Sequence, residues 1–196
     1  MKLSEAEAFI VNELRTKLSD TLYYHSLGHV MDVTDAVVRI ARAEGIRDEE
    51  TLDLLRTAAL FHDVGFTRTY NGHEEEGCRI SKEVLPRFEY TPEQIWTICG
   101  MIRATRIPQS PQNKLEEILC DADLDYLGRH DFETIAHYLY RELKERGMVE
   151  NEKAWNRIQI EFMENHQYWS RTAQRSRQPM KDEHLCRLRE MVKEEA

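Results

Sequence analysis

Apolar side chains recur at helical spacing along almost the whole chain, and this periodicity is the feature that most constrains the fold. Within segment 26–44, the apolar residues that fall on one helical stripe are Val30, Val33, Val37 and Ile40. No stretch alternates apolar and polar residues for long, and only eight glycines and five prolines interrupt the 196 residues. The pattern therefore predicts an all-α fold built from many helices.

Helix-capping residues divide this pattern into separate elements. Ser4 and Asp48 stand where an N-cap is expected, Gly45 is a natural helix stop, and Thr91 begins a capping box with proline in the first turn. A loop is expected at 107–111. The helices that we predict cover 4–18, 26–44, the segment from Asp48 to His62, 91–102, 113–121, 131–146, 151–171 and 182–194, with 172–181 as an exposed connector.

The length of the chain suits one compact domain with a helical C-terminal extension. We place the boundary near residue 150, so that 1–150 forms the domain and 151–196 packs on it. The aromatic residues Trp155, Tyr168 and Trp169 in the extension serve either as core or as an interface in a homodimer. The sequence leaves both uses open.

Charge and composition exclude several classes of protein. The chain has 36 acidic and 27 basic residues, a net charge of −9, which argues against general nucleic-acid binding. No apolar run approaches eighteen residues, so we expect no membrane span. The four cysteines are Cys78, Cys99, Cys120 and Cys186, and none forms a CxxC pair. We expect them to be reduced core thiols of a cytoplasmic protein.

Two segments place histidines at helix ends. His25 and His29 lie four residues apart at the start of segment 26–44, where both rings could face one cavity or stand partly exposed. His62 and Asp63 end an apolar helix and are followed by Gly65. Burying an imidazole and a carboxylate there is costly unless a metal ion satisfies both. The alternatives are a buried His-Asp hydrogen bond or an Asp63 that faces solvent.

Two further segments concentrate acidic residues. Asp121, Asp123 and Asp125 lack the glycine and distal glutamate of a calcium loop, so we expect one acid to face inward and two to face outward, or a solvated helix end. The acids 74–76 suit the first turn of the next helix, where they meet the positive end of its dipole. His73, just before them, is harder to explain as a surface residue.

The order of these residues resembles the HD-domain superfamily of metal-dependent phosphohydrolases. The resemblance covers about residues 20–145 and implies an HD-type all-α domain in which a metal ion is bound by four residues. The residues that match the family's ligands are His29, the pair His62 and Asp63, and Asp123, with Asp121 in reserve. Segment 24–33 is similar to the start of the catalytic domain of cyclic-nucleotide phosphodiesterases, which implies that His25 is a general acid.

One departure from the family concerns the number of metal ions. Two-metal HD enzymes carry a histidine at the position of His73 and further histidines about one helix later, but segment 98–106 has none. We therefore expect one tightly bound ion. His73 would then contact a weak second ion or a phosphate.

The donor set suits particular ions and a hydrolytic reaction. Two imidazoles and two carboxylates favour Mn²⁺, Fe²⁺, Co²⁺, Ni²⁺ or Zn²⁺ over Mg²⁺, and the ion would activate a bound water. Asp63 or Asp123 would accept the proton of that water, and His25 would protonate the leaving oxygen. The arginines that we expect to hold phosphate oxygens, or otherwise to lie on the surface, are Arg68, Arg103 and Arg106.

The sequence thus predicts a phosphohydrolase for a small-molecule phosphate ester, with nucleotides and cyclic nucleotides as the expected substrates. One alternative is a signalling module that binds a nucleotide in a degenerate pocket without turnover. Another is an iron-dependent oxygenase, against which the histidine-free segment 98–106 argues.

Overall fold

The structure, a computed structural model, describes residues 1–194, which contain helices and no strand. The predicted all-α fold is confirmed. The α-helices are α1 (Leu3–Lys17), α2 (Leu27–Ala43), α3 (Glu49–Phe61), α4 (His73–Val84), α5 (Pro92–Ala104), α6 (Lys114–Asp123), α7 (Phe132–Glu145), α8 (Glu152–Asn165), α9 (Arg171–Ser176) and α10 (Gln178–Glu194). Short 3-10 helices are η1 (Val64–Thr67), η2 (Leu85–Phe88) and η3 (Asp125–Gly128).

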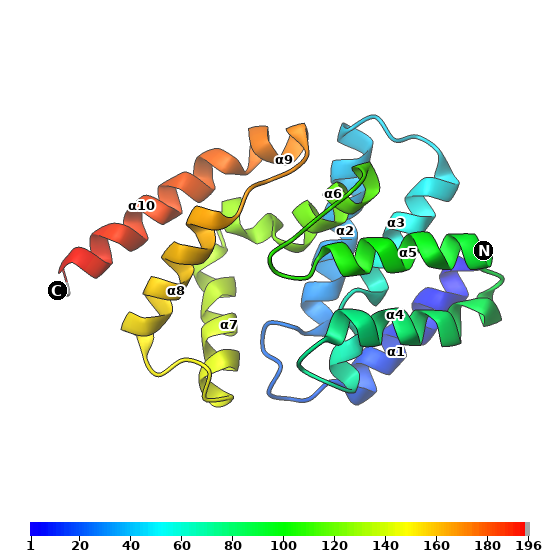
Figure 1. Ribbon diagram of the computed structural model, residues 1–196, viewed down its shortest axis with the longest axis horizontal. Helices are drawn as coiled ribbons and strands as arrows, with labels where there is room; N and C mark the ends of the chain where they lie inside the picture. The colour runs from blue at the N-terminus through cyan, green and yellow to red at the C-terminus, as the bar shows by residue number, and fades with distance from the viewer. Residues whose placement is uncertain (195–196) are drawn as a thin grey trace.

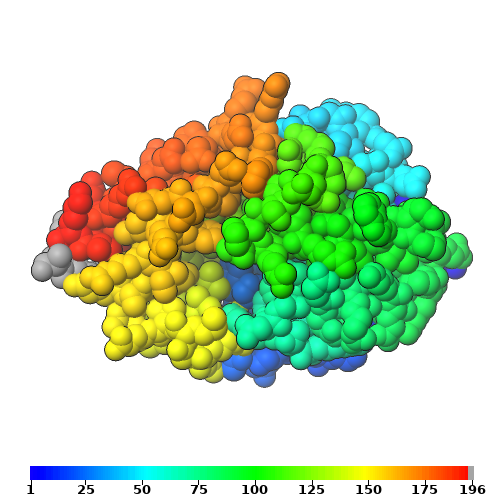
Figure 2. All heavy atoms as spheres, in the orientation of Figure 1, coloured from blue at the N-terminus to red at the C-terminus, as the bar shows by residue number. Residues whose placement is uncertain are grey.

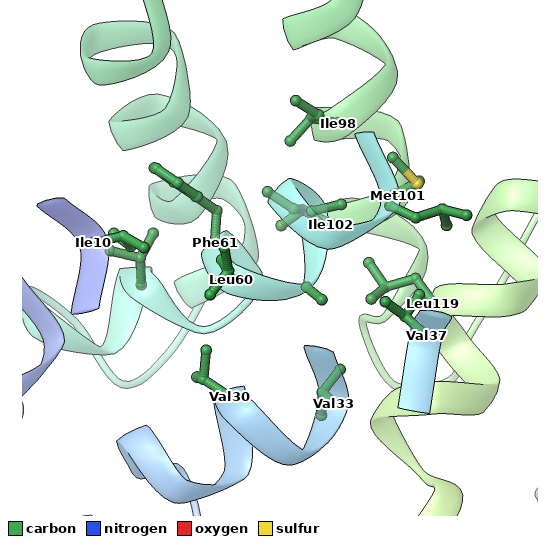
Figure 3. Close-up of a cluster of buried hydrophobic side chains, with 14 of the residues drawn as sticks. Ile10, Val30, Val33, Val37, Leu60, Phe61, Ile98, Met101, Ile102 and Leu119 are labelled. Atoms are coloured by element: carbon green, nitrogen blue, oxygen red, sulfur yellow. The ribbon is translucent and has the colours of Figure 1, made fainter. Parts of the chain in front are cut away.

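Helices α1 to α6 enclose the larger hydrophobic core. The apolar stripe of α2 packs against α3 and α6, and α5 covers the opposite side of α3 (Figure 3). The side chains that meet there include Val30, Val33, Val37, Phe61, Ile98, Ile102 and Leu119, all at most 1% exposed. This packing holds α2, α3 and α6, which carry the chemistry-bearing residues, in fixed relative positions.

A second hydrophobic cluster lies at the other end of the molecule, between η3 and helices α7, α8 and α10 (Figure 1). Its members include Leu127, Phe132, Tyr140 and Trp155, and the rings of Tyr140 and Trp155 stack with their centroids 6.2 Å apart. Segments before and after residue 150 both contribute to it. The division at residue 150 remains a prediction, because a shared cluster does not show which part folds alone.

Two predicted N-caps are confirmed, and a third was wrong. The side chains of Asp48 and Thr91 accept hydrogen bonds from the first turns of α3 and α5, and Thr91 forms the capping box with Gln94. Ser26, which the sequence analysis did not name as a cap, does the same for α2. Helix α1 instead begins after Lys2, so Ser4 lies inside its first turn. The backbone N–H of Lys2 is bonded to the carbonyl of Phe88, which ties the start of α1 to η2.

The C-terminal extension differs from the predicted elements. The expected helix 151–171 is broken at Asn165 and resumes as α9, and the expected connector 172–181 is helical in most of its length. Pro179 is compatible with a helix here because it lies in the first turn of α10, where a backbone N–H group has no acceptor within the helix. Lys181 is 2% exposed, and its ammonium group donates to the carbonyl oxygen of His166 at 2.5 Å.

Buried acids fasten this extension to the larger core. Both carboxylate oxygens of Asp121 accept hydrogen bonds from the backbone N–H groups of Trp169 and Ser170, at 2.8 and 2.7 Å. Asp125 binds the guanidinium group of Arg177. The prediction that two of the three acids face outward was therefore wrong, because Asp121 and Asp125 are at most 2% exposed and are satisfied by the later chain.

Two further expectations concern cysteines and membranes. All four cysteines are free, and Cys78, Cys99 and Cys120 are buried as predicted, whereas Cys186 is exposed on α10. Across residues 1–194, each helix is too short or too polar to cross a lipid bilayer.

Gly65 generates the first prediction. A Cβ atom at this position would lie 1.9 Å from the carbonyl oxygen of His73, inside the backbone that leads into α4. We expect Gly65→Ala to lower the free energy of unfolding by about 2 kcal/mol or more, because backbone must move. Gly100→Ala is the control, since its Cβ would meet only the flexible carboxylate of Glu116. Urea unfolding of both variants measures the difference, and equal stabilities would contradict the prediction.

Glu44 generates a prediction about pH. Burial acts to raise its pKa, but hydrogen bonds from Lys114 and the backbone of Thr172 outweigh burial and lower the pKa to about 2. A carboxylate with a lowered pKa adds stability at neutral pH, and this stability is lost as pH falls from the unfolded-state value of 4.5 toward 2.

We expect Glu44→Gln to lower the free energy of unfolding by about 1 kcal/mol at pH 7, and by progressively less as the pH falls below 4.5. Urea unfolding of wild type and variant at several pH values measures this. The control Glu13→Gln removes an exposed pair with Lys17 and should change stability little at any pH. A Glu44→Gln penalty that grows as the pH falls would contradict the sign.

Candidate metal centre

Three helix ends bring the four predicted ligands together. His29 lies in the first turn of α2, where its backbone N–H is capped by Ser26 Oγ at 3.4 Å. His62 is the C-cap of α3, Asp63 follows it, and Asp123 is the last residue of α6. Because α2, α3 and α6 share one core, these ends meet at one point on its edge.

The donor atoms are spaced as the ligands of one ion. His29 Nε2 lies 3.1 Å from Asp123 Oδ1 and 3.3 Å from His62 Nε2, and His62 Nε2 lies 3.4 Å from Asp123 Oδ1. Metal–ligand bonds of about 2.1 Å place neighbouring donors roughly 3 to 3.5 Å apart. His29, His62 and Asp123 therefore form a group that can hold a divalent metal.

Asp63 supplies a fourth oxygen beside this group. Its Oδ2 lies 3.2 Å from His62 Nε2 and 3.5 Å from His29 Nε2. This oxygen is buried and accepts no hydrogen bond of normal geometry. A buried carboxylate oxygen without such a bond is costly, and a cation among these donors would satisfy it.

A hydrogen bond at Nδ1 of His62 determines which nitrogen of the ring faces the other donors. Nδ1 donates to the carbonyl oxygen of Ala59 at 2.7 Å, within the last turn of α3. Nδ1 therefore carries a hydrogen, and Nε2 is the atom that faces the other ligands. A backbone carbonyl behind a ligating histidine is a usual way to orient the ring toward a metal.

The charges of His62, Asp63 and Asp123 shift one another's pKa values more strongly than burial does. Burial acts to lower the pKa of His62, but the facing carboxylates of Asp63 and Asp123 raise it well above its ordinary value. Burial acts to raise the pKa of Asp63 and Asp123, but the histidines hold both well below their usual range. The two carboxylates thus stay ionised, which is the form that binds a cation.

His25 stands beside the group and is held by a residue that the sequence analysis missed. His25 Nδ1 lies 2.5 Å from Glu142 Oε1, and Glu142 Oε2 accepts the backbone N–H groups of Tyr24 and His25. The Glu142 side chain is fully buried on α7, and Tyr70 also donates to it at 3.1 Å. No sequence pattern marks Glu142, because 117 residues separate it from His25.

His73 faces the same region from the start of α4. Its Nε2 lies 3.6 Å from Asp63 Oδ1 and 3.8 Å from Glu74 Oε1. The ring stacks on Phe66 with centroids 3.9 Å apart, and burial lowers its pKa. Glu74 is 8% exposed, so it faces inward. The sequence analysis predicted only that it would lie near the positive end of the dipole of α4.

A cavity of about 280 Å³ opens in front of these residues. Its polar end includes His25, Asp63, His73, Glu74 and Asp123. Figure 2 shows the hollow between the yellow segment of α7 and α8 and the green segment of α4 and α5, with blue N-terminal residues at its floor.

The three predicted phosphate-binding arginines lie outside this cavity. Arg68 binds Glu76 at 3.1 Å, and Arg103 binds Glu75 at 2.9 Å, both on the exposed side of α4. Arg106 is exposed. Over the whole of residues 1–194, no arginine or lysine lines the cavity. The arginines thus take the surface positions that were the alternative for each of them.

Asp121 and Asp123 offer a sharp comparison, since both were candidates for the final ligand. We expect Asp123→Asn to lower affinity for Mn²⁺ at least tenfold, because it removes a donor from the group. Asp121→Asn should leave metal binding unchanged. It should lower the free energy of unfolding by about 2 kcal/mol, because it weakens the charge-assisted hydrogen bonds from Trp169 and Ser170. Metal content after dialysis and urea unfolding of the metal-free proteins measure these effects. Equal metal content in wild type and Asp123→Asn would contradict the assignment.

Comparisons with known proteins show what this chain is similar to. An uncharacterized protein of Clostridium beijerinckii is 38% identical over 78 residues, which cover 36% of this chain and 46% of that protein. The chain thus matches less than half the length of this relative. The crystal structure of a "predicted HD superfamily hydrolase" from an uncultured Thermotogales bacterium matches with a TM-score of 0.63 and 21% identity, over 96% of this chain and 92% of the other. At that identity, the likeness shows the fold.

The family assignment rests on the match to a family model. The HD domain model matches residues 26–127, a segment that begins at the cap of α2 and ends just after the last ligand-bearing helix. It contains His29, the pair His62 and Asp63, and Asp123. By its sequence match, its fold and the family's His-Asp pair, the chain belongs to the HD-domain family.

Proposed function

We propose that this protein is a metal-dependent phosphohydrolase that cleaves a phosphate ester of a small molecule. The observation that carries the proposal is the group His29, His62 and Asp123, whose Asp123 lines one cavity together with Asp63 and His25. Nucleotides and cyclic nucleotides are the substrates that the resemblance suggests. The net charge of −9 supports a small-molecule substrate over general nucleic-acid binding, and the free thiols support a cytoplasmic location.

A divalent ion in this group would activate a water molecule near neutral pH and screen the negative charge of the phosphate. The donor set of two imidazoles and two carboxylates suits Mn²⁺, Fe²⁺, Co²⁺, Ni²⁺ or Zn²⁺ better than Mg²⁺. We propose one such ion. Segment 98–106, where two-metal HD enzymes carry further histidines, has none, and its residues Ile98, Cys99 and Ile102 are buried in the core.

The chain's own residues provide for both proton transfers. Asp63 and Asp123 are the carboxylates of the group, and either is placed to accept the proton of the attacking water. The bond to Glu142 keeps a hydrogen on His25 Nδ1, which leaves Nε2 to give its proton to the leaving oxygen. His73 would contact a phosphate oxygen or a weak second ion. Glu142 is a positioning residue, because it acts through His25.

A module that binds a nucleotide without turnover is the second candidate. Such a module would hold the phosphates mainly through lysine and arginine side chains, and the described residues that line the cavity include neither. Binding alone also does not require a histidine beside the metal group that is oriented by a buried carboxylate, as His25 is by Glu142. These observations favour the enzyme.

Glu142 and His25 supply the test of this mechanism. We expect Glu142→Gln and His25→Asn each to lower kcat about 100-fold or more on a panel of phosphate monoesters and diesters, with KM changed much less. The Mn²⁺ content should stay at the wild-type level, since neither residue belongs to the metal group.

The control is Glu145→Gln, one turn later on α7, where the carboxylate accepts a hydrogen bond from the exposed hydroxyl of Tyr23. Its kcat should match that of wild type. Absence of metal-dependent turnover of every ester by the wild-type protein would overturn the proposed function. Unchanged kcat in His25→Asn would overturn the role of His25 alone.

A further inference from the structure

We propose that the substrate carries a single phosphate group on an apolar alcohol, whose hydrocarbon part lies between α7 and α8. The inference rests on the proposed function for its phosphate end, and goes beyond it by naming the class of the alcohol. It follows from two observations. One end of the cavity is polar and the other apolar, and polar side chains that line the cavity form hydrogen bonds within the protein.

The end of the cavity away from the metal group is apolar. It is built mainly by η3, α7 and α8, at the left of the hollow in Figure 2. The side chains that form it include Leu127, Phe132, Leu139, Leu143, Trp155 and Phe162. A concave apolar surface of this kind gains free energy when it covers a hydrocarbon group.

Helical spacing directs these side chains at one another. Leu139 and Leu143 are four residues apart on α7, so they share one face, and both remain half-buried. Trp155, Ile158 and Phe162 stand at the matching three- and four-residue intervals on α8. Ile107 and Ile158, among the more exposed large apolar residues at 53% and 42%, also line the cavity. These residues are therefore available to a ligand.

The charge of the cavity limits the number of phosphate groups. Its ionisable lining consists of histidines, tyrosines and carboxylates, and residues 1–194 contribute no lysine or arginine to it. One divalent ion can offset the charge of one phosphate group. A diphosphate or triphosphate would bring further negative charge toward Asp63, Glu74 and Asp123 without a cation to receive it.

Two of the polar side chains that line the cavity donate their hydrogens within the protein. The hydroxyl of Thr105 donates to the carbonyl oxygen of Ile102 at 2.8 Å. The amide of Gln159 donates to Asn156 Oδ1 at 3.2 Å. The sugar hydroxyls and base edges of a nucleoside would lose hydrogen bonds to water there and find few replacements, whereas a hydrocarbon group loses none. An apolar alcohol therefore fits better than a nucleoside.

Binding of alkylphosphonates to the Mn²⁺-loaded protein tests the inference without depending on turnover. Ethyl-, butyl-, hexyl- and octylphosphonate share one head group and differ only in apolar length. We expect the affinity, measured by calorimetry, to rise about threefold for each added methylene until the cavity is full. Octylphosphonate should bind at least tenfold more tightly than adenosine monophosphate. Affinities that do not rise with chain length, or a nucleotide that binds more tightly, would overturn the inference.

A matched pair of variants locates the hydrocarbon. Leu143→Asn puts an amide into the apolar end of the cavity. We expect it to lower the affinity for octylphosphonate about tenfold and to change the affinity for ethylphosphonate less than twofold. Leu185→Asn is the control, because Leu185 is half-buried against the same hydrophobic cluster but lies outside the cavity. Equal losses of octylphosphonate affinity in the two variants would overturn the placement between α7 and α8.

Turnover of the matching alkyl phosphates separates this inference from the proposed function. Chain-dependent binding together with metal-dependent hydrolysis supports both. Chain-dependent binding of the phosphonates without hydrolysis of octyl phosphate or of any other ester would overturn the hydrolase and leave the apolar class of ligand standing. Hydrolysis with no preference for chain length would overturn the inference and leave the hydrolase standing.

Discussion

The buried pairing of His62 with Asp63 and Asp123 is the interaction on which the site depends. These groups lie at the ends of α3 and α6, where isolated charges would be costly to bury. The facing charges keep the two carboxylates ionised and raise the pKa of His62, and Asp63 Oδ2 still lacks a hydrogen bond of normal geometry. To bind a divalent cation, His62 must give up its Nε2 proton, and the cation would then satisfy the same carboxylates in place of that proton.

The core of α1 to α6 can build this cluster but not the whole cavity. Glu142, which orients His25, comes from α7, and the apolar wall comes from α7 and α8. The later chain is held in place by the carboxylates of Asp121 and Asp125 and by its own hydrophobic cluster. The C-terminal extension therefore belongs to the site, because it shapes what the metal group can meet.

Sequence patterns predicted the elements that depend on neighbouring residues. The N-caps of α3 and α5 and the inward stripe of α2 follow from contacts within one or two helical turns. The same reasoning failed for Arg68 and Arg103, which are suited to phosphate by chemistry but pair with Glu76 and Glu75 outside the cavity. It also failed for Asp121, whose partners lie 48 and 49 residues away.

The amino-acid order predicts the helical class, several helix starts and the family, because capping, periodicity and the order of His29, His62, Asp63 and Asp123 can be recognised along the chain. Which groups share the cavity depends on packing. In the folded chain Glu142 lies against His25, the arginines lie outside, and an apolar wall stands before the metal group. Local hydrogen bonds act over a few residues, whereas a cavity is formed by side chains that packing brings together from distant segments.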